Sequence, residues 1–472
     1  KKFIWLESNE NKISEYKKII KVNKNKQVFI LVPTVAEIDR LARDLGLHEK
    51  DAVKVYSGQN KTKVFGDWLD ILAGKPKIIL ATKMGALLPF NNLGAVIIDQ
   101  ENDWNHKQSD INPRYDSRRV AEWIARYHKV SLILAGFAPS LEVYYELLSD
   151  EKKKNTIDFE VVDLKQEQMG GNYSFLSEKM VSEINLVLEK NKKVFILHNR
   201  KGAAGYVSCK DCGYVFVCPE CEISLVYYNE TKKMHCHHCG YRQDIPPLCP
   251  KCSGPNITFK SKGIEDVVSK IKKEWPDKKI QSLFLGSEKY DKKAEIVVGT
   301  EFALDKIDWS EFGLVVVLNF DQLVMRPEFR ASEKSWQMLQ MIGVKLAVGK
   351  ILLQTFNREN EILKNINKAD KFYKNEMEMR KALNYPPFKK VIKIISQDQS
   401  KQRAYYVADL LVKKLKSTKD IEVSDPLPSY PRKVRGKFKY NVIIKTDKAN
   451  KMEWIKDVGN DFVVDVDPEK LI

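Results

Sequence analysis

Short, continuous apolar runs recur along the first third of the chain and are separated by amphipathic stretches. Apolar side chains at helical spacing indicate helices over residues 35–46 and 141–148. The apolar runs lie at residues 27–33, 77–82, 94–101 and 131–136. Strands that are apolar at every position are typical of a parallel sheet covered by helices on both faces. This pattern therefore predicts one α/β lobe over residues 1–150.

The pattern restarts after a polar linker, which we place at residues 150–171. A second α/β lobe is predicted over residues 151–205 and 260–380, interrupted after its first strand by a cysteine-rich module at 206–259. Its apolar runs lie at residues 193–200, 294–300, 313–319 and 350–356. The composition changes again near residue 381, and a small α+β domain is predicted over 381–472. Its strands and single helix are expected at residues 391–396, 404–416, 441–446 and 462–467.

All eight cysteines lie between residues 209 and 252 and form four C-x₂-C pairs. The pairs are Cys209/Cys212, Cys218/Cys221, Cys236/Cys239 and Cys249/Cys252, with gaps of five, fourteen and nine residues. Two thiolates at this spacing can bind one tetrahedral ion from a tight turn, so the eight predict two closed, structural zinc sites. The alternative, a disulfide framework, is typical of small secreted domains. We expect His235, His237 and His238 not to be ligands, because the cysteines complete both sets.

The chain carries a large positive charge. Its 80 lysines and arginines against 63 aspartates and glutamates give a net charge of +17, with a pI of about 9.2. This excess favours a polyanionic partner, nucleic acid first and an acidic membrane face second. The alternative is that the lysine-rich composition reflects only a low-GC genome. No apolar run reaches the ~18–20 residues that span a bilayer. The opening KKFIWLESNE shows no signal peptide, so we expect a cytoplasmic protein.

Several short motifs occur in a fixed order. NRKG at 199–202 precedes the cysteine module and CHHCG at 236–240 lies within it. Further motifs are FRASE at 329–333, YPPF at 385–388, RG at 435–436 and DVDP at 465–468. With the cysteine spacing they resemble the primosomal protein N′ (PriA) family, superfamily 2 DNA helicases that restart stalled replication forks. The resemblance covers the whole chain and implies two tandem RecA-like helicase lobes, while the family's N-terminal DNA-binding region is expected to be absent.

The resemblance also implies which cysteines share an ion. The outer pairs, Cys209/Cys212 and Cys249/Cys252, would hold one zinc ion. The inner pairs, Cys218/Cys221 and Cys236/Cys239, would hold the second. In this nested arrangement the inner site caps a hairpin whose base the outer site closes.

The family's ATPase motifs are degenerate in this chain. A P-loop needs G-x-x-x-x-G-K-[ST], but residues 6–13 read LESNENKI and keep only Lys12. The D-E-E-H box reads Asp99-Gln-Glu-Asn, with an amide at position 100 where a carboxylate would position the attacking water. Residues 136–138 lack the hydroxyls of S-A-T, residues 299–309 lack a central Lys-Gly, and residues 341–348 lack the arginine fingers. Five coincident losses predict a dead ATPase.

We therefore expect no intact catalytic residue, with Lys12, Asp99 and Glu101 as vestiges. Lys12 and Asp99 would survive at lobe surfaces by chance, and replacing Lys12 with alanine would be silent. In the competing interpretation, Lys12 still contributes to a site for ATP and Mg²⁺ that holds the lobes closed.

Two surfaces are predicted to bind DNA. One is a loop that resembles the family's aromatic-rich loop, where aromatic rings would stack on bases and cations would meet phosphate. Its candidate residues are Trp104, Lys107, Arg114 and Tyr115. The other is a basic run interleaved with Phe438 and Tyr440, made of Arg432, Lys433, Arg435, Lys437 and Lys439. The alternatives are that the aromatic rings pack beneath the loop and that the basic run is a solvated face.

The first functional hypothesis is a PriA-like scaffold that binds forked or single-stranded DNA without hydrolysing ATP. The resemblance implies single-strand-binding protein and other primosome components as partners, and we expect a monomer that does not bind membranes. The second hypothesis is an active ATP-dependent 3′–5′ DNA helicase whose motifs have diverged. The third is a zinc-ribbon RNA-binding or structural nucleoprotein built on a helicase frame.

Overall fold

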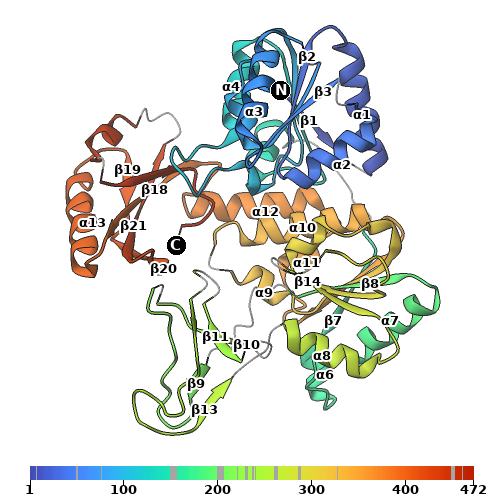
Figure 1. Cartoon of the computed structure of the whole chain (residues 1–472), viewed down its shortest axis with the longest axis vertical. Helices are drawn as coiled ribbons and strands as arrows, with labels where there is room; N and C mark the ends of the chain where they lie inside the picture. Colours follow the sequence, from blue (N-terminus) through green and yellow to red (C-terminus); the bar gives the residue numbers. More distant parts are fainter. Residues whose placement is uncertain are drawn as a thin grey trace.

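The computed structural model describes most of the chain, and its parts are arranged as shown in Figure 1. Lobe 1 is blue, lobe 2 runs from green to orange, and the red C-terminal domain lies to one side above the cysteine module. The described residues are 1–6, 8–48, 51–75, 77–148, 157–198, 207–220, 222–228, 232–236, 239, 241–259, 264–284, 287, 289–326, 328–447, 452–459 and 461–471.

Lobe 1 is built on a six-stranded parallel sheet in the order β1-β6-β5-β2-β4-β3. The apolar runs form its buried centre, and all five residues of β2 are buried. The strands are β1 (Lys2–Trp5), β2 (Gln27–Leu31), β3 (Ala52–Val55), β4 (Ile78–Ala81), β5 (Leu93–Ile98) and β6 (Ser131–Gly136). Because all the strands run parallel, Asp99 and the end of β6 meet at one edge of the sheet.

Helices cover both faces of this sheet. Helices α1 (Asn9–Val22) and α2 (Val35–Leu45) pack on one face, and α3 (Lys61–Leu72) and α4 (Ser117–Tyr127) pack on the other. The Thr34 hydroxyl caps α2 by accepting from the Glu37 amide, and Gly46 ends it with a φ of 71°. The helix predicted over residues 141–148 is a short α5 (Leu141–Val143) followed by a π-helical turn, η3 (Tyr144–Leu148). The single-turn helices of this lobe are η1 (Lys83–Leu87) and η2 (Trp104–His106).

Lobe 2 contains a second six-stranded parallel sheet, in the order β14-β15-β8-β16-β17-β7. Its strands are β7 (Phe159–Asp163), β8 (Lys193–Leu197), β14 (Ile280–Leu283), β15 (Ile296–Gly299), β16 (Phe312–Val317) and β17 (Lys350–Thr355). The predicted linker at 150–171 is wrong in part, since it contains β7 and α6 (Leu164–Met169). The cysteine module therefore follows the second strand of this lobe and not the first. The additional strand is β7, which pairs with β17 through main-chain hydrogen bonds although it carries charged side chains.

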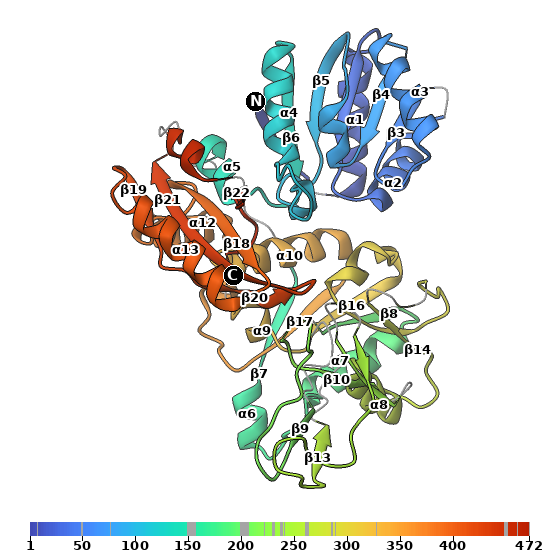
Figure 2. The ribbon, with the colours of Figure 1, turned by 60° about the vertical axis from the view of Figure 1, so that its left-hand side comes forward.

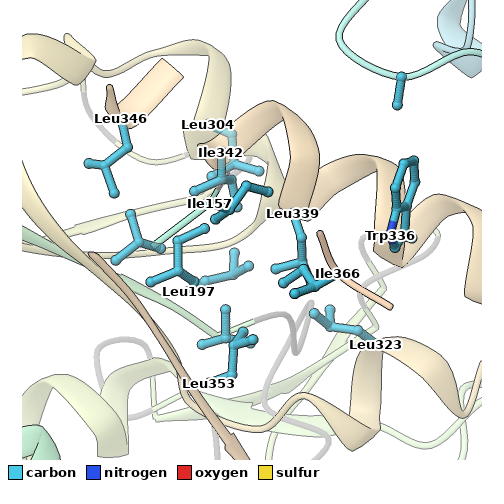
Figure 3. Packing of buried hydrophobic residues seen from close by; sticks show 14 of the residues in the cluster. Ile157, Leu197, Leu304, Leu323, Trp336, Leu339, Ile342, Leu346, Leu353 and Ile366 are labelled. Carbon is cyan, nitrogen blue, oxygen red and sulfur yellow. The ribbon is translucent and has the colours of Figure 1, made fainter. Parts of the chain in front are cut away.

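Helices α7 (Glu178–Glu189) and α8 (Ile264–Glu274) pack on one face of the second sheet. The other face packs against α10 (Ala331–Leu346), whose Leu339, Ile342 and Leu346 point toward Leu197 and Leu353 of the sheet (Figure 3). The remaining helices are α9 (Asp321–Val324), α11 (Glu361–Lys364), α12 (Ala369–Ala382), η4 (Glu301–Asp305) and η5 (Trp309–Glu311). This face makes the larger core, because it also receives residues of lobe 1.

The cysteine module is small and held by short strands. Strand β9 (Val207–Cys209) pairs with β13 (Ile257–Phe259) at its base, where the chain enters and leaves the module, and a separate three-stranded sheet lies between these two strands in the sequence. The strands of this sheet are β10 (Val226–Tyr228), β11 (Lys233–His235) and β12 (Arg242–Gln243). Its cluster of buried apolar residues and cysteines is small, which makes metal binding the expected source of its stability.

The C-terminal domain is an antiparallel sheet with one helix, α13 (Lys401–Leu415), packed on one face. The sheet order is β19-β21-β18-β22, and β20 also pairs with β21. The strands are β18 (Lys389–Asp398), β19 (Ile421–Val423), β20 (Leu427–Val434), β21 (Lys437–Asp447) and β22 (Val463–Val466), and a short η6 (Glu453–Asp457) precedes β22. The edge strand β22 lies on the side of the domain that faces lobe 1 (Figure 2).

The two lobes share one hydrophobic cluster. Leu141 and Tyr144 of lobe 1 are buried together with Trp336, Phe372 and Tyr373 of lobe 2. The Tyr144 and Tyr373 rings stack at 4.0 Å, and α10 runs between the lobes in both views (Figures 1 and 2). The lobes therefore contact each other directly through these buried apolar and aromatic side chains.

The predicted fold class is confirmed by the two parallel sheets, the cysteine module and the antiparallel C-terminal sheet. The residue boundaries assigned to the four units remain predictions. The sequence reading missed the short strands β1, β3, β7 and β14. No helix within the described ranges is long and apolar enough to cross a membrane.

Candidate zinc centres and nucleic-acid interface

The four outer cysteines lie together at the base of the cysteine module, with their ligand atoms within 4.8 Å of one another. The sulfur atoms of Cys209 and Cys252 are 3.6 Å apart, and those of Cys212 and Cys249 are 3.7 Å apart. Four thiolates around one zinc ion, with bonds of about 2.3 Å, place their sulfurs about 3.8 Å apart, whereas a disulfide bond is about 2.05 Å long. The observed spacing fits a tetrahedral zinc site.

Three of the inner cysteines form a second cluster, made of Cys218, Cys236 and Cys239. The sulfur atoms of Cys218 and Cys239 are 3.5 Å apart. Cys221, the predicted fourth ligand, lies outside the described residues, as do His237 and His238. His235 is described on β11 and is not grouped with either set of sulfurs.

The same hydrogen-bonded turn spans each C-x₂-C pair. The backbone amide of the first cysteine donates to the carbonyl of the residue five positions later, at 2.7–2.9 Å. The four bonds join Cys209 to Tyr214, Cys218 to Ile223, Cys236 to Tyr241 and Cys249 to Gly254. The repeat of one hydrogen bond at all four C-x₂-C pairs indicates that one local backbone arrangement is used at each pair. At the outer cluster, four cysteines are enough to complete a tetrahedral zinc ion and would leave no position for a catalytic water.

Two residues of the degenerate ATPase motifs, Lys12 and Asp99, belong to a buried ion-pair cluster. The Lys12 ammonium lies 2.6 Å from one Asp99 oxygen and 3.8 Å from Glu37, and the Tyr16 hydroxyl donates to the other Asp99 oxygen at 2.7 Å. Lys12 is 2% exposed and Asp99 is fully buried, so their expected placement at lobe surfaces is wrong. Burial alone would raise the pKa of Glu37, but Lys12 and Arg40 lower it to about 2. The cluster is therefore a charged structural core of lobe 1.

The other motif residues are also engaged in structural contacts. Glu101 accepts hydrogen bonds from both the amide and the hydroxyl of Ser140, at 3.0 and 2.8 Å, and burial raises its pKa. On α10, where the family carries arginines, Met341 and Val344 pack against the hydrophobic core of lobe 1. The nearby Lys345 lies 3.6 Å from Asp305.

The predicted aromatic-rich loop packs between the two lobes. The Trp104 ring lies 4.9 Å from the Arg118 guanidinium, 4.7 Å from that of Arg330 and 5.4 Å from the Lys334 ammonium. The Tyr115 hydroxyl donates to the Lys83 carbonyl at 3.0 Å, and the side chain is half-buried. Both rings thus make packing contacts, as the alternative interpretation expected, and Trp104 bridges lobe 1 to lobe 2.

Two cations of this loop bind the C-terminal domain. Lys107 was expected to face solvent and phosphate, but its ammonium is 3.0 Å from Asp465 and donates to the Val466 carbonyl at 2.6 Å. Arg114 lies 3.3 Å from the other oxygen of Asp465. The Lys107 side chain is 1% exposed, so this residue does not offer a free charge in this arrangement of the chain.

The basic run lies on a hairpin made by β20 and β21. Arg435 and Gly436 form its two-residue turn, with φ values of 50° and 76°, as expected of a turn of type I′. Arg432, Arg435 and Lys437 are exposed. Lys433 instead lies over the Phe438 ring and donates to the Pro219 carbonyl of the cysteine module at 3.2 Å.

The hairpin and the loop of lobe 1 contribute to one group of cations. Burial, and then repulsion from Arg114 and Arg435, lower the pKa of Lys439. Burial also lowers the pKa of Lys393 on β18, where Asp465 opposes the shift and Arg114 and Lys439 add to it. Asp465 connects two of these cations, because it lies 3.3 Å from Arg114 and opposite Lys393 in the β18–β22 register, and Arg435 and Lys439 lie on the adjoining β20–β21 hairpin. We name these four residues the basic cluster.

Sequence reasoning missed Lys393, which lies on a strand where every neighbouring residue is apolar. That break in an apolar run was the only signal available. It also missed Arg118 and Arg330, which hold Trp104, although Arg330 belongs to the FRASE motif.

Two family models match parts of this chain. The model of the PriA DNA helicase Cys-rich region (CRR) domain matches residues 218–243, and that of the primosomal protein N C-terminal domain matches residues 381–469. Replication restart protein PriA of Thermotoga maritima is 29% identical over 94% of this chain and 64% of its own length. PriA of Bacillus subtilis is 26% identical over 89% of this chain and 56% of its own length, and PriA of Rickettsia prowazekii is 29% identical over 92% and 71%.

These matches confirm the resemblance to the PriA family. The aligned region spans less than two thirds of the Thermotoga and Bacillus proteins. Among solved structures, RecG bound to a three-way DNA junction aligns with 79% of this chain and 43% of its own, at 11% identity and a TM-score of 0.42. That likeness is too distant to support an argument about this chain.

Replacing Lys12 should destabilise lobe 1, because Asp99 and Glu37 would keep their buried charges without it. Removing one partner of a buried ion pair costs about 3–5 kcal/mol, so Lys12→Met should lower the unfolding free energy by that order in chemical denaturation. Lys12→Met combined with Asp99→Asn should recover part of the loss. Lys18→Met on the same helix is the matched control, since Lys18 is exposed and pairs only with Glu15. A Lys12→Met variant as stable as this control would contradict a structural role.

Proposed function

Because two PriA family models match this chain and proteins named PriA align with most of it, we propose that it binds forked or single-stranded DNA as a replication-restart scaffold and does not hydrolyse ATP. The basic cluster is the observation that carries the proposal. Its four cations come from lobe 1 and from the C-terminal domain, so only the folded chain assembles them. Grouped cations at the surface of a protein with a charge of +17 suit a phosphate backbone.

Exposed arginines and lysines extend this surface along the β20–β21 hairpin. Arg432, Arg435 and Lys437 are free to follow a backbone, and Tyr430, 76% exposed on β20, adds a ring on which a base could stack. Lys433 joins the hairpin to the cysteine module, which places the module beside this surface. The proposed DNA contacts are these residues and the basic cluster, with Trp104 and Tyr115 as internal supports of the loop. Single-strand-binding protein and other primosome components are the proposed protein partners.

The absence of ATP turnover is supported by the state of the motif residues. Hydrolysis needs a cation on the β- and γ-phosphates, a carboxylate on Mg²⁺ and a group that positions water. Here Lys12 and Asp99 neutralise each other in the interior, and position 100 carries an amide. Met341 and Val344 of α10 contact the core of lobe 1 where arginine fingers would be needed.

We expect DNA binding to depend strongly on salt and to involve the hairpin. Replacing Arg432, Arg435 and Lys437 with alanine removes three exposed cations and should flatten the plot of log affinity against log salt by roughly two to three, about 0.7–0.9 per contact. Fluorescence anisotropy with a labelled fork measures this slope. The control replaces three exposed lysines of α1, Lys17, Lys18 and Lys21, which removes the same charge. Equal slopes for the two triple variants would exclude the hairpin, and tighter binding to structured RNA than to the fork would favour the RNA-binding alternative.

The purified chain should show no DNA-stimulated release of phosphate from ATP. A sensitive phosphate assay with saturating forked DNA tests this directly, and a relative with intact motifs serves as the positive control. Turnover that is lost in Asp99→Asn would contradict the scaffold proposal and establish the helicase alternative.

The chain should bind two structural zinc ions. Elemental analysis should find two per folded chain, and Cys236→Ser should reduce the number to one while both lobes keep their cooperative unfolding. Cys212→Ser is the companion variant, because it removes a ligand of the outer site and should leave the inner ion bound. One ion in the unmodified protein would contradict the assignment of two sites.

A further inference from the structure

Asp465 occupies the position of an anion between two cations of lobe 1. Its oxygens lie 3.0 Å from the Lys107 ammonium and 3.3 Å from the Arg114 guanidinium, and the residue is 2% exposed. A carboxylate held by a lysine and an arginine has the same charge and the same kind of contacts as a phosphate oxygen pair. The C-terminal domain therefore places an internal anion into the loop of lobe 1.

Arg114 is only partly satisfied by this anion. Its contact with Asp465 uses a single terminal nitrogen, and its buried Nε has no hydrogen-bond partner among the residues that the structure describes. A guanidinium binds phosphate best through two parallel N–H bonds. Within the described part of the chain, the Arg114 Nε thus lacks an acceptor, which Asp465 does not supply.

The charges around Asp465 are also unbalanced. Lys393 lies opposite Asp465 in the β18–β22 pairing, and repulsion from Arg114 contributes to its lowered pKa and to that of Lys439. Three cations (Lys107, Arg114 and Lys393) thus gather around one carboxylate. A phosphodiester chain, which brings one charge per nucleotide, would neutralise this group better than a single aspartate does.

The strand that carries Asp465 has a neighbour on one side only, although its Val464 and Val466 pack against the core of the domain. β22 has four residues, forms the edge of its sheet and pairs only with β18. Asp467, directly after it, has a φ of 52°, which is unfavourable for a residue with a side chain. An edge strand makes main-chain hydrogen bonds to one neighbouring strand only, so fewer bonds break when it leaves the sheet.

We propose that Lys107 and Arg114 form a phosphate-binding site for the nucleic-acid backbone, which Asp465 fills until nucleic acid displaces β22. The site rests on the proposed DNA-binding function and adds its regulation. Without nucleic acid, the Asp465 carboxylate keeps the two cations paired and holds the C-terminal domain against lobe 1. On binding, a backbone phosphate takes the place of the carboxylate, and Arg114 gains an acceptor for Nε.

The test compares Asp465→Asn with Asp425→Asn. Both remove one negative charge from the C-terminal domain, but Asp425 is exposed near β19, the opposite edge strand, and pairs with Lys416. Asp465→Asn should bind a labelled fork at least about fivefold more tightly than the control. Its salt slope should be steeper by about 1.4–1.8, because two cations are released for phosphate. Equal or weaker binding than the control would overturn the proposal, whereas no binding by the unmodified chain would instead reject the proposed function.

Hydrogen exchange in the unmodified protein gives a second measurement that does not depend on a variant folding. Addition of the fork should speed the exchange of the backbone amides of residues 463–466, since β22 leaves β18. Slower or unchanged exchange with saturating DNA would overturn the displacement. If millimolar inorganic phosphate alone produces the same acceleration, the site binds free anions and its assignment to nucleic acid is overturned.

Discussion

A stack of cations and aromatic rings joins the two lobes and the C-terminal domain. The arrangement of these three bodies depends on this stack. From lobe 1 through lobe 2 to the C-terminal domain, the stack consists of Arg118, Trp104, Arg330, Phe329, Tyr385 and Lys445. Arg330 lies 4.7 Å from the rings on both of its sides, and the Phe329 and Tyr385 rings are 4.5 Å apart and almost parallel. Each cation–ring contact contributes about 0.5–2 kcal/mol. The Trp104–Arg330 contact joins lobe 1 to lobe 2, and the Phe329–Tyr385 contact joins lobe 2 to the C-terminal domain.

Buried charges fix the same junction. Arg330 is paired with Glu142 of lobe 1 at 2.6 Å, and Arg380 of α12 is paired with Glu333 at 2.9 Å and Glu376 at 2.8 Å. Burial would raise the pKa of Glu142, but Arg330 lowers it to about 2. Separating the lobes would leave the guanidinium of Arg330 without its carboxylate partner in lobe 1, and the effective penalty is several kcal/mol per unpaired buried ion. A nucleotide-driven cycle requires lobes that open and close, so a junction of this kind suits a fixed scaffold better than a motor.

The strands that form the sheet centres could be predicted from the sequence, because burial on both faces leaves an unbroken apolar run such as residues 27–31. The missed strands β7 and β14 are edge strands, and the polar residues that they tolerate hide their periodicity. The cysteine pairs were visible because metal binding imposes a spacing that chance rarely produces. The environment of Lys107 could not be predicted. Its partner, Asp465, is more than 350 residues away, and a lysine in a polar loop has the same sequence signature whether it is solvated or buried.

Residues of the family motifs are kept or lost in this chain according to the contacts that their side chains make. FRASE and YPPF are retained, and their Phe329, Arg330, Glu333 and Tyr385 form the stack and its ion pairs, which are needed whether or not ATP is bound. The glycines of the P-loop and the arginines of α10 would contact phosphates only, and these are the motif residues that this chain lacks. Lys12 and Asp99 appear at first to be exceptions, but they bind each other in the interior of lobe 1 and so belong to the first group. A retained residue of a catalytic motif is therefore not a sign of catalysis when its side chain has a buried partner of opposite charge.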